Sequence, residues 1–400
     1  MFIIQSMRLN HAGRTKAVLL GLAVPFGFAL LLSLVSCGDW FDSPDSATVP
    51  QLLKTLENGS PKARMEAAHL LGSRDEDADI VVPALIKALQ DQDGRVRSSA
   101  VSALGFIGPA GKVAVPNVLD ALQHDPDAEV RTSAAFSLAS LDGEGAVPAL
   151  IQALQHDRSG LVRADVAIAL GRIGPAARAA VPALIAAIEQ HDRPSFIDFN
   201  TDLLPNAAEA LGKIGAAAAA AVPTLTESLG DSDRYLRWRS AEALVRIGLP
   251  ARSAIPALLT ALQNDSEAAV RWRAAFAIGK IDPVSISQNS EAISVLRNAM
   301  QSDSDAEVRA YAAYVIARIR STTPGTLPDL EPSLTAAVPD LIQTLKDEDP
   351  NVRVGAILAL GAIGPSADAA LPDLTQAVND DNPYVHTTAM QALKQIHPLP

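Results

Sequence analysis

Aromatic residues make up only 4% of this 400-residue sequence, although 48% of it is hydrophobic. Alanine and leucine therefore supply most of the side chains available for a core. A sheet protein of this size would need more aromatic and β-branched residues, because those side chains fit a pleated surface. The composition predicts an all-α fold.

Cysteine is nearly absent, since it occurs once, at Cys37. A single cysteine excludes an internal disulfide and any metal site built from several thiolates. The chemistry of this residue must therefore depend on its position in the chain.

Acidic residues are missing from the first 38 positions. Arg8, Arg14 and Lys16 precede a nearly uninterrupted apolar run over residues 17–35, and the first carboxylate is Asp39. A basic start followed by an apolar segment is typical of a secretory signal peptide.

The end of this run, Leu34-Val35-Ser36-Cys37 followed by Gly38, resembles the lipobox of bacterial lipoproteins. This resemblance implies that residues 1–36 are removed and that Cys37 becomes an acylated first residue. Residues 37–46 would then be a lipidated tether. Two or more acyl chains make a stable anchor, so we expect a membrane-anchored protein of the bacterial cell envelope that faces the periplasm or the cell exterior. The alternative is an uncleaved membrane helix, for which about 20 apolar residues suffice.

Basic residues are too few to balance the acidic ones. The formal net charge is −12, and removing the three basic residues of the signal changes it to −15. Binding to nucleic acid depends on basic patches that displace counterions, so nucleic acid is not an expected partner. An anionic lipid surface would also repel this body, which leaves the lipid anchor as the expected membrane contact.

An internal repeat determines the predicted architecture. Weaker copies of the repeated block, with its proline, end at Pro50, Pro83, Pro148 and Pro339, and a copy without the proline lies near Ala292. Together they give ten units from about Val49 to Ile396. The five clear copies are ALGFIGPAGKVAVP ending at Pro116, ALGRIGPAARAAVP at Pro182, ALGKIGAAAAAAVP at Pro223, ALVRIGLPARSAIP at Pro256 and ALGAIGPSADAALP at Pro372.

Each unit is predicted to fold as two helices. Proline opens the first helix, where its missing N–H is tolerated. After a turn, Asp93 or its equivalent caps a second helix, which Gly108 ends and Pro109 prevents from resuming. Such pairs bury their apolar faces by stacking on neighbouring pairs. Glycine inside the second helix, as at Gly105, predicts a close approach of backbones there. Gly171, Gly212 and Gly361 repeat it.

The repeated LGxIGPxAxxAVPxLxxAL pattern resembles HEAT repeats, in the bacterial form first associated with bilin lyases. The resemblance covers essentially all of residues 47–398 and implies an α-solenoid, a superhelix of about ten helix pairs. In HEAT repeats an arginine early in the second helix takes part in a ladder between units. Here each such arginine follows an acidic cap by four residues: Asp93 and Arg97, Asp127 and Arg131, Asp233 and Arg237, Glu267 and Arg271, Asp305 and Arg309, Asp349 and Arg353.

Insertions interrupt the pattern at residues 191–206, 282–290 and 320–335. The first of these lacks the ladder arginine, and we interpret it as a hinge or a ligand-contacting loop. A loop folded onto its own helices is the alternative.

Catalytic motifs are lacking, since the sequence contains no GxSxG elbow, phosphate-binding loop or HExxH helix. The His-Asp pairs at residues 124–125, 156–157 and 191–192 end first helices, where a charge role at the helix end fits better than a metal site. We therefore expect no enzyme activity, no metal and no cofactor.

Three functions follow from these observations. The first is a scaffold that binds other proteins through the concave face of the solenoid. The second, implied by the lyase resemblance, is bilin-lyase-like or other tetrapyrrole handling. The third is a passive structural spacer at the membrane.

The predicted partner-binding surface lies on second helices. Trp238 and Trp272 occupy the same position in neighbouring units, one residue after the ladder arginine. This position points away from the buried stripe of the helix. Exposed tryptophan and arginine dominate protein interfaces, so we predict that the following residues bind the partner: Trp238, Arg239, Trp272, Arg273, Phe276, Tyr311 and Tyr314. The alternative is that the tryptophans fill gaps, Trp272 by folding over Phe276.

Overall fold

The computed structural model describes residues 47–189, 203–322 and 331–397. Within these ranges every regular element is an α-helix or a 3-10 helix. The contacts divide the chain after Ser46, so the helical repeats form a unit that begins at Ala47.

The described helices form ten consecutive pairs, and the two members of a pair are called the first and second helix below. A short extra helix, α15 (Pro283–Ser287), lies between the seventh and eighth pairs. The pairs are α1 (Val49–Asn58) with α2 (Pro61–Leu71), α3 (Ala78–Ala88) with α4 (Gly94–Ile107), α5 (Val115–His124) with α6 (Ala128–Leu141), α7 (Val147–His156) with α8 (Gly160–Ile173), α9 (Val181–Glu189) with α10 (Leu203–Ile214), α11 (Val222–Glu227) with α12 (Arg234–Ile247), α13 (Ile255–Asn264) with α14 (Ala268–Ile281), α16 (Ser290–Ser302) with α17 (Ala306–Thr322), α18 (Glu331–Thr344) with α19 (Pro350–Ile363), and α20 (Leu371–Ala377) with α21 (Pro383–Ile396).

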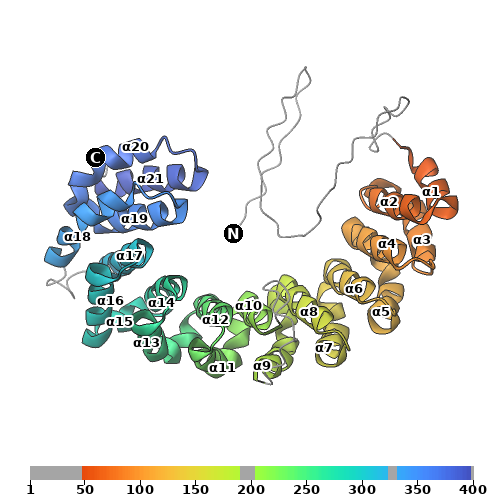
Figure 1. The fold of residues 1–400 in the computed structure, drawn as a ribbon, viewed down its shortest axis with the longest axis horizontal. Coiled ribbons are helices and arrows are strands. Elements are labelled where there is room, and N and C mark those ends of the chain that lie inside the picture. The colour runs from red at the N-terminus through yellow and green to blue at the C-terminus, as the bar shows by residue number, and fades with distance from the viewer. Residues whose placement is uncertain (1–46, 190–202, 323–330, 398–400) are drawn as a thin grey trace, which may run out of the picture. The chain divides into compact units, whose positions relative to one another are not determined.

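Successive second helices pack against one another in one row, and the first helices form a second row beside it (Figure 1). Each helix contacts its partner in the pair, and each second helix contacts the second helices of the neighbouring pairs. This nearest-neighbour stacking is the geometry of an α-solenoid. The predicted all-α solenoid of about ten repeats is therefore confirmed.

The ends of the second helices have the predicted chemistry. At α4 the Asp93 carboxylate accepts a hydrogen bond from the Arg95 backbone N–H at 2.9 Å. Gly108 ends the helix with a φ of +68°, a conformation that residues with a side chain rarely adopt. Pro109 follows directly, and the chain continues as a 3-10 helix over Gly108–Ala114 before the next pair begins.

The predicted role of proline fails in two pairs. Pro83 lies inside α3 and Pro339 lies inside α18, so neither opens its helix. Both helices begin five or more residues earlier, at Ala78 and Glu331. Proline removes a hydrogen bond only to the residue four positions back, so a helix can extend in the N-terminal direction where the preceding sequence allows it.

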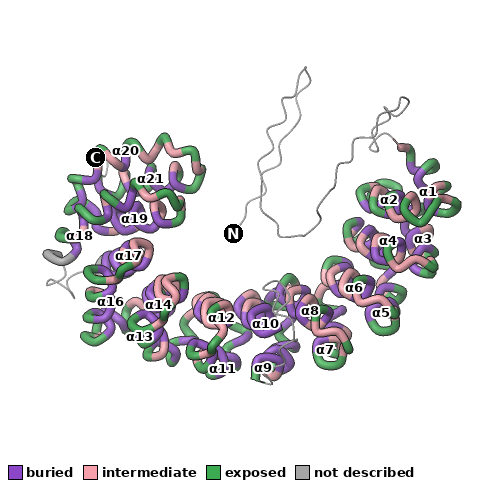
Figure 2. The backbone as a smooth tube through the Cα atoms, in the orientation of Figure 1, coloured by how far each residue is buried: buried purple, intermediate pink, exposed green. Residues whose placement is uncertain are grey.

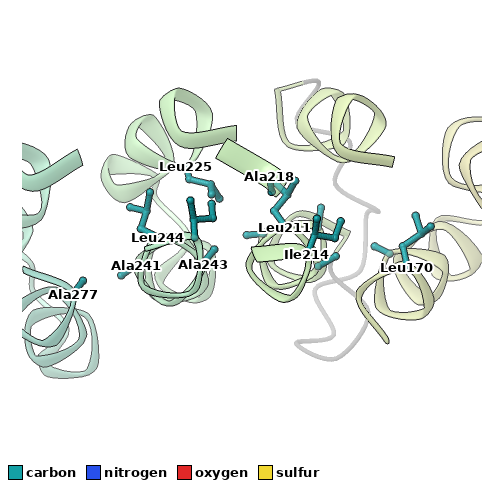
Figure 3. Close-up of a cluster of buried hydrophobic side chains, with 14 of the residues drawn as sticks. Leu170, Leu211, Ile214, Ala218, Leu225, Ala241, Ala243, Leu244 and Ala277 are labelled. Carbon is teal, nitrogen blue, oxygen red and sulfur yellow. The ribbon is translucent and has the colours of Figure 1, made fainter. Parts of the chain in front are cut away.

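One leucine in each of three successive second helices shows how the core is built. Leu170, Leu211 and Leu244 are fully buried and lie in α8, α10 and α12 (Figure 3). Figure 2 shows that α10 is buried along most of its length. Figure 3 also shows Leu225 of α11 close to Leu244. Full burial of such a side chain contributes about 2 kcal/mol, and the repeat supplies this contribution at every level of the stack.

Glycine inside the second helix allows neighbouring second helices to approach closely, as predicted. A Cβ added at Gly212 would lie 2.8 Å from the Ala243 Cα, and one added at Gly105 would lie 2.8 Å from the Ser137 Cα. Both contacts are to backbone atoms, which cannot move aside as a flexible side chain can. The glycines therefore set the spacing between repeats.

Three helical stretches are long and apolar enough to cross a membrane by length and composition: Gly94–His124, Gly160–Glu189 and Pro350–Ala377. Each joins the second helix of one pair to the first helix of the next. Each also contains a glycine with positive φ. About half of each apolar window is buried among the repeats, so the stacking of the repeats accounts for its apolar character.

The insertions are described only in part. Residues 203–206, predicted as part of an expanded turn, form the buried start of α10. The short α15 occupies most of the second insertion, and the Asp282 carboxylate caps it by accepting from the Ser285 N–H at 3.1 Å. Residues 190–202 and 323–330 lie outside the described part, so the hinge interpretation of the first insertion stays a prediction.

Candidate functional site

An arginine-aspartate ladder joins successive repeats at the turns between the helices. Arg131 of α6 shows its geometry, because its Nε and Nη2 donate to the two carboxylate oxygens of Asp157 at 2.7 and 2.9 Å. Arg131 Nη1 also donates to the Asp125 carbonyl in its own turn at 3.0 Å. Only 4% of the Arg131 side chain and 6% of the Asp157 side chain is exposed. Equivalent two-pronged pairs are Arg64–Asp91, Arg97–Asp125, Arg237–Asp265, Arg271–Asp303 and Arg353–Asp380.

The ladder is confirmed, but its acidic partners differ from the residues that the sequence pattern paired with the arginines. The carboxylate that receives Arg97 is Asp125 in the next repeat, and the cap Asp93 instead accepts the backbone N–H of its own helix. An N-cap side chain is already committed to its helix, so the arginine reaches across to the next turn. The aspartates of the His-Asp pairs at Asp125 and Asp157 are thus ladder residues.

The ladder is interrupted at α17. Arg309 donates to the carbonyls of Asp303 and Ser304 in its own turn, but in the described part of the chain it forms no ion pair with the next repeat. Glu307, on the same helix, has its pKa raised to about 7 by burial and by the charges of Asp349 and Asp305. Negative charges therefore face each other at the α17–α19 contact.

A second set of contacts joins neighbouring second helices at positions that are buried or half-buried between repeats, and not fully exposed as the sequence predicted. In four places, the residue directly after the ladder position of one repeat contacts the residue that lies two positions after the ladder position of the next repeat. The contacts of this set are Ser98 with Ser133, Thr132 with Asp165, Trp238 with Arg273, and Trp272 with Tyr311. Four of the seven predicted partner-binding residues therefore belong to this inter-repeat row, whose side-chain chemistry varies from repeat to repeat: Trp238, Trp272, Arg273 and Tyr311.

Trp272 lies against the next repeat. Its ring stacks on Tyr311, with centroids 4.8 Å apart and planes at 21°, and it packs against the core. Tyr311 also meets Phe276 edge-on at 6.0 Å. The predicted alternative, in which Trp272 folds over Phe276, is thus replaced by a cluster in which Tyr311 touches both rings.

The Trp238 ring contacts two arginine side chains. Unlike Trp272, it is not one of the half-buried side chains that pack against the core. The guanidinium carbons of Arg239 and Arg273 lie 4.7 and 5.2 Å from its ring centroid. Cation–π contacts of this kind contribute about 1 kcal/mol each. The indole is therefore positioned by charged neighbours while part of it stays accessible.

Each arginine of this surface has an acidic partner that the sequence analysis did not identify. Arg239 pairs with Glu209 at 3.0 Å, and Arg273 pairs with Glu242 at 2.5 Å. Both glutamates lie on the preceding second helix. Burial lowers the pKa of Arg273, which Glu242 partly offsets. The surface predicted to be aromatic and basic is thus aromatic with balanced charge.

The other predicted residues are placed as follows. Phe276 receives the Lys280 ammonium at 5.3 Å from its centroid. Tyr314 packs against the core, and its hydroxyl accepts from Arg318 on the same helix at 3.3 Å, so it stands apart from the cluster. Cys37, the predicted lipidation site, lies outside the described residues.

A cavity of about 560 Å³ opens beside Trp238, between α10, α12 and α14. Its lining residues are Pro205, Asn206, Arg234, Tyr235, Trp238, Arg239, Glu267, Ala269 and Val270. Ligand sites in proteins have volumes of about 300–1,000 Å³, so this cavity is large enough to hold a side chain or a small molecule.

Comparison with known families identifies the repeats. Six overlapping stretches match HEAT repeats: residues 49–139, 115–196, 147–244, 195–279, 255–337 and 333–394. The chain belongs to the HEAT-repeat family. No curated protein sequence matches it significantly.

This HEAT-repeat chain is similar in fold to solved solenoids. One is Kap95p, in a structure titled for its induction of the GTP-bound conformation in the switch loops of RanGDP, with a TM-score of 0.58, 17% identity, and coverage of 87% of this chain and 51% of the other. Another is Kap121p bound to Pho4p, with a TM-score of 0.51, 15% identity, and coverage of 86% and 41%. The chain thus spans about half or less of these proteins. An engineered protein aligns over 98% of its own length at 22% identity, with a TM-score of 0.47.

Proposed function

We propose that this protein is a lipid-anchored, extracytoplasmic scaffold that binds other proteins through the second helices α12, α14 and α17. HEAT solenoids that it resembles in fold bind proteins, as the Kap121p complex with Pho4p illustrates. The lipobox-like segment ending at Cys37 supports the anchored location, and the absence of recognisable catalytic motifs favours binding over catalysis.

The observation that carries the proposal is the setting of Trp238. This indole is half-buried, lies outside the hydrophobic core and borders a cavity. A large aromatic side chain left partly open beside a cavity is a typical anchor point of protein interfaces. Trp272, in the same position of the next repeat, supports the surface through its stack on Tyr311.

Single alanine substitutions of the two tryptophans test the proposal, with partner capture from a membrane extract and thermal melting measured on the same proteins. We expect Trp238→Ala to abolish capture while lowering the free energy of unfolding by about 2 kcal/mol, the sum of its two cation–π contacts. Trp272→Ala should cost more, about 3 kcal/mol, because its ring packs on the core and on Tyr311. The double variant should show both effects.

Phe106→Ala is the matched control, because Phe106 is an aromatic residue on the second helix α4 and is 70% exposed. It should keep both the partners and the stability. A Trp238→Ala protein that melts earlier yet retains its partners would show that this tryptophan has a structural role, as the alternative of a passive spacer requires.

A further inference from the structure

The cavity beside Trp238 exists because one repeat has a small residue where its neighbours have larger ones. Ala269 lies two residues before the ladder arginine of α14. The same position is occupied by Tyr235 in the preceding repeat and by Glu307 in the following one. A methyl group at Ala269 leaves a space of about 560 Å³ that a tyrosine there would occupy in part.

The walls of this cavity are largely apolar. Trp238 and Tyr235 border it from α12, Pro205 from α10, and Ala269 and Val270 from α14. Walls of this composition favour a bulky apolar group, because burial of such a group against aromatic rings removes a large apolar area from water.

Polar groups at the cavity favour a carboxylate. Arg234 is the more accessible cation, since 52% of its side chain is exposed and its nearest acidic partner, Glu267, lies 3.7 Å away. Its Nη2 donates to the Tyr235 hydroxyl at 3.0 Å, so the other guanidinium nitrogens are the ones that can reach a ligand. Arg239 also lines the cavity, but Glu209 pairs with it. The grooves along the ladder differ, because aspartates outnumber arginines there, as in the one lined by Asp91, Arg97, Asp120 and Asp125.

Two further groups supply a donor and an acceptor. The Glu267 side chain makes no cap hydrogen bond at the start of α14, whereas in six other second helices the N-cap side chain accepts the N–H equivalent to that of Ala269. Asn206 is nine-tenths buried, and its Nδ2 donates to the Ala164 carbonyl at 3.5 Å. Its Oδ1 accepts no hydrogen bond from the described residues, which leaves it available to an N–H group.

We propose that this cavity binds a segment of a partner protein in which a bulky apolar side chain lies next to a carboxylate. The apolar side chain packs between Trp238 and Ala269. The carboxylate accepts hydrogen bonds from Arg234 and from the Ala269 N–H, and a backbone N–H of the segment donates to Asn206 Oδ1. This inference rests on the proposed function, since it defines the chemistry of the partner that the second helices hold.

N-acetyl-L-phenylalanine is a minimal probe, because it combines an aromatic side chain, a carboxylate and one amide N–H. Its binding to the full mature chain is measured by NMR from the indole N–H signal of Trp238, which Trp238→Phe assigns. We expect a dissociation constant on the order of 1 mM, as is usual for a ligand of this size. N-acetyl-L-phenylalaninamide, which lacks the charge, should bind about tenfold more weakly.

Substitutions separate the cavity from the rest of the surface. Ala269→Tyr introduces the residue that the preceding repeat already carries at this position, and it should reduce probe affinity at least tenfold with the fold intact. Asn351→Tyr introduces the same residue at the equivalent position of α19 and should leave affinity unchanged. Arg234→Gln should abolish the preference for the carboxylate over the amide.

Several outcomes would overturn the inference. They are the absence of a Trp238 shift, equal binding of the two probes, and unchanged binding to the Ala269→Tyr variant. If the probe fails while Trp238→Ala still loses its partners, the cavity inference is wrong and the proposed function stands. If the probe binds as expected while Ala269→Tyr captures every partner, the cavity does not hold a partner segment.

Discussion

Asp157→Ala removes the acidic half of the most deeply buried ladder pair in the described chain. Arg131 would keep its hydrogen bonds to the carbonyls of Asp125 and Pro126, but its charge would lose the carboxylate that two of its nitrogens contact. Leaving a buried charge without its partner typically costs about 3–5 kcal/mol. We expect about 3 kcal/mol, because the arginine retains its carbonyl acceptors.

The loss should be local, since the repeats are coupled only to their neighbours. Hydrogen exchange of the amides of α6 and α8 should accelerate about a hundredfold, which corresponds to the expected 3 kcal/mol. Amides of α19 and α21 should be unaffected. The double variant Arg131→Met/Asp157→Leu should recover much of the protection, because it removes both charges and replaces them with apolar groups.

The pH dependence gives a second measurement on the same variant. Burial raises the pKa of Asp157, but the hydrogen bonds from Arg131 and from the Ser159 N–H outweigh this effect, so the pKa lies below its ordinary value. A carboxyl of this kind stabilises the fold above its unfolded pKa of about 3.9 and loses that effect as the pH falls through its folded pKa. The acid-induced loss of protection at α6–α8 should therefore be smaller in Asp157→Ala.

Glu57→Ala is the control, because the Lys87–Glu57 pair also joins two repeats but both side chains are mostly exposed. Surface pairs of this kind contribute little, so no local change is expected. If Asp157→Ala behaves like Glu57→Ala in hydrogen exchange, the reasoning that the ladder holds adjacent repeats together is refuted.

Three further predictions address other features. Cys37→Ala should abolish the incorporation of a labelled fatty acid, and a wild-type chain that takes up no label would show that the lipobox interpretation is wrong. Gly212→Ala should destabilise the α10–α12 contact by about 1–2 kcal/mol, because the new Cβ meets the Ala243 backbone. Gly230→Ala is the control and should not change the free energy of unfolding, because a Cβ there meets nothing within 4 Å. Chemical denaturation measures both variants. The pKa of Glu307 is raised to about 7 in the fold, so the contribution of its protonated form to stability is complete below the unfolded pKa and is lost as the pH rises towards and through 7. Glu307→Gln should therefore stabilise the α17–α19 contact at pH 8 and leave it unchanged at pH 4. Hydrogen exchange measures this difference.

The sequence predicted the helix pairs well because their signals are local. Asp93 and Gly108 mark the ends of a second helix through interactions that span only a few residues, and both act as predicted. The glycine at Gly212 was also informative, since its recurrence within a helix has no local explanation and therefore indicated a close neighbour.

The contacts between repeats were predicted less well because they depend on two segments at once. The ladder arginines were recognised, but Asp125 was assigned to a helix-end role although it receives Arg97. A signal was present: an aspartate stands two residues before the cap of the next repeat wherever a pair is found. Comparing each ladder arginine with the turn of the following repeat would have identified this aspartate as its partner.

The charge balance of the tryptophan surface was missed for the same reason. Arg239 and Arg273 looked like free cations because Glu209 and Glu242 lie about 30 residues earlier, on the preceding helix. The cavity at Ala269 was not predicted because three helices, α10, α12 and α14, form it together, and their spacing cannot be derived from the sequence pattern. Its only trace in the sequence is a small residue at a position where the neighbouring repeats carry larger ones.

The ladder has a consequence for how such a protein can diversify. In the described part of the chain, an arginine and an aspartate hold successive turns together in six places. The positions that directly follow the ladder arginines are then not needed for the same interaction in every repeat, and they form contacts as different as a serine pair at Ser98 and Ser133 and a ring stack at Trp272 and Tyr311. A change of binding specificity can therefore be confined to one or two repeats, while the ladder that holds the repeats together is unchanged.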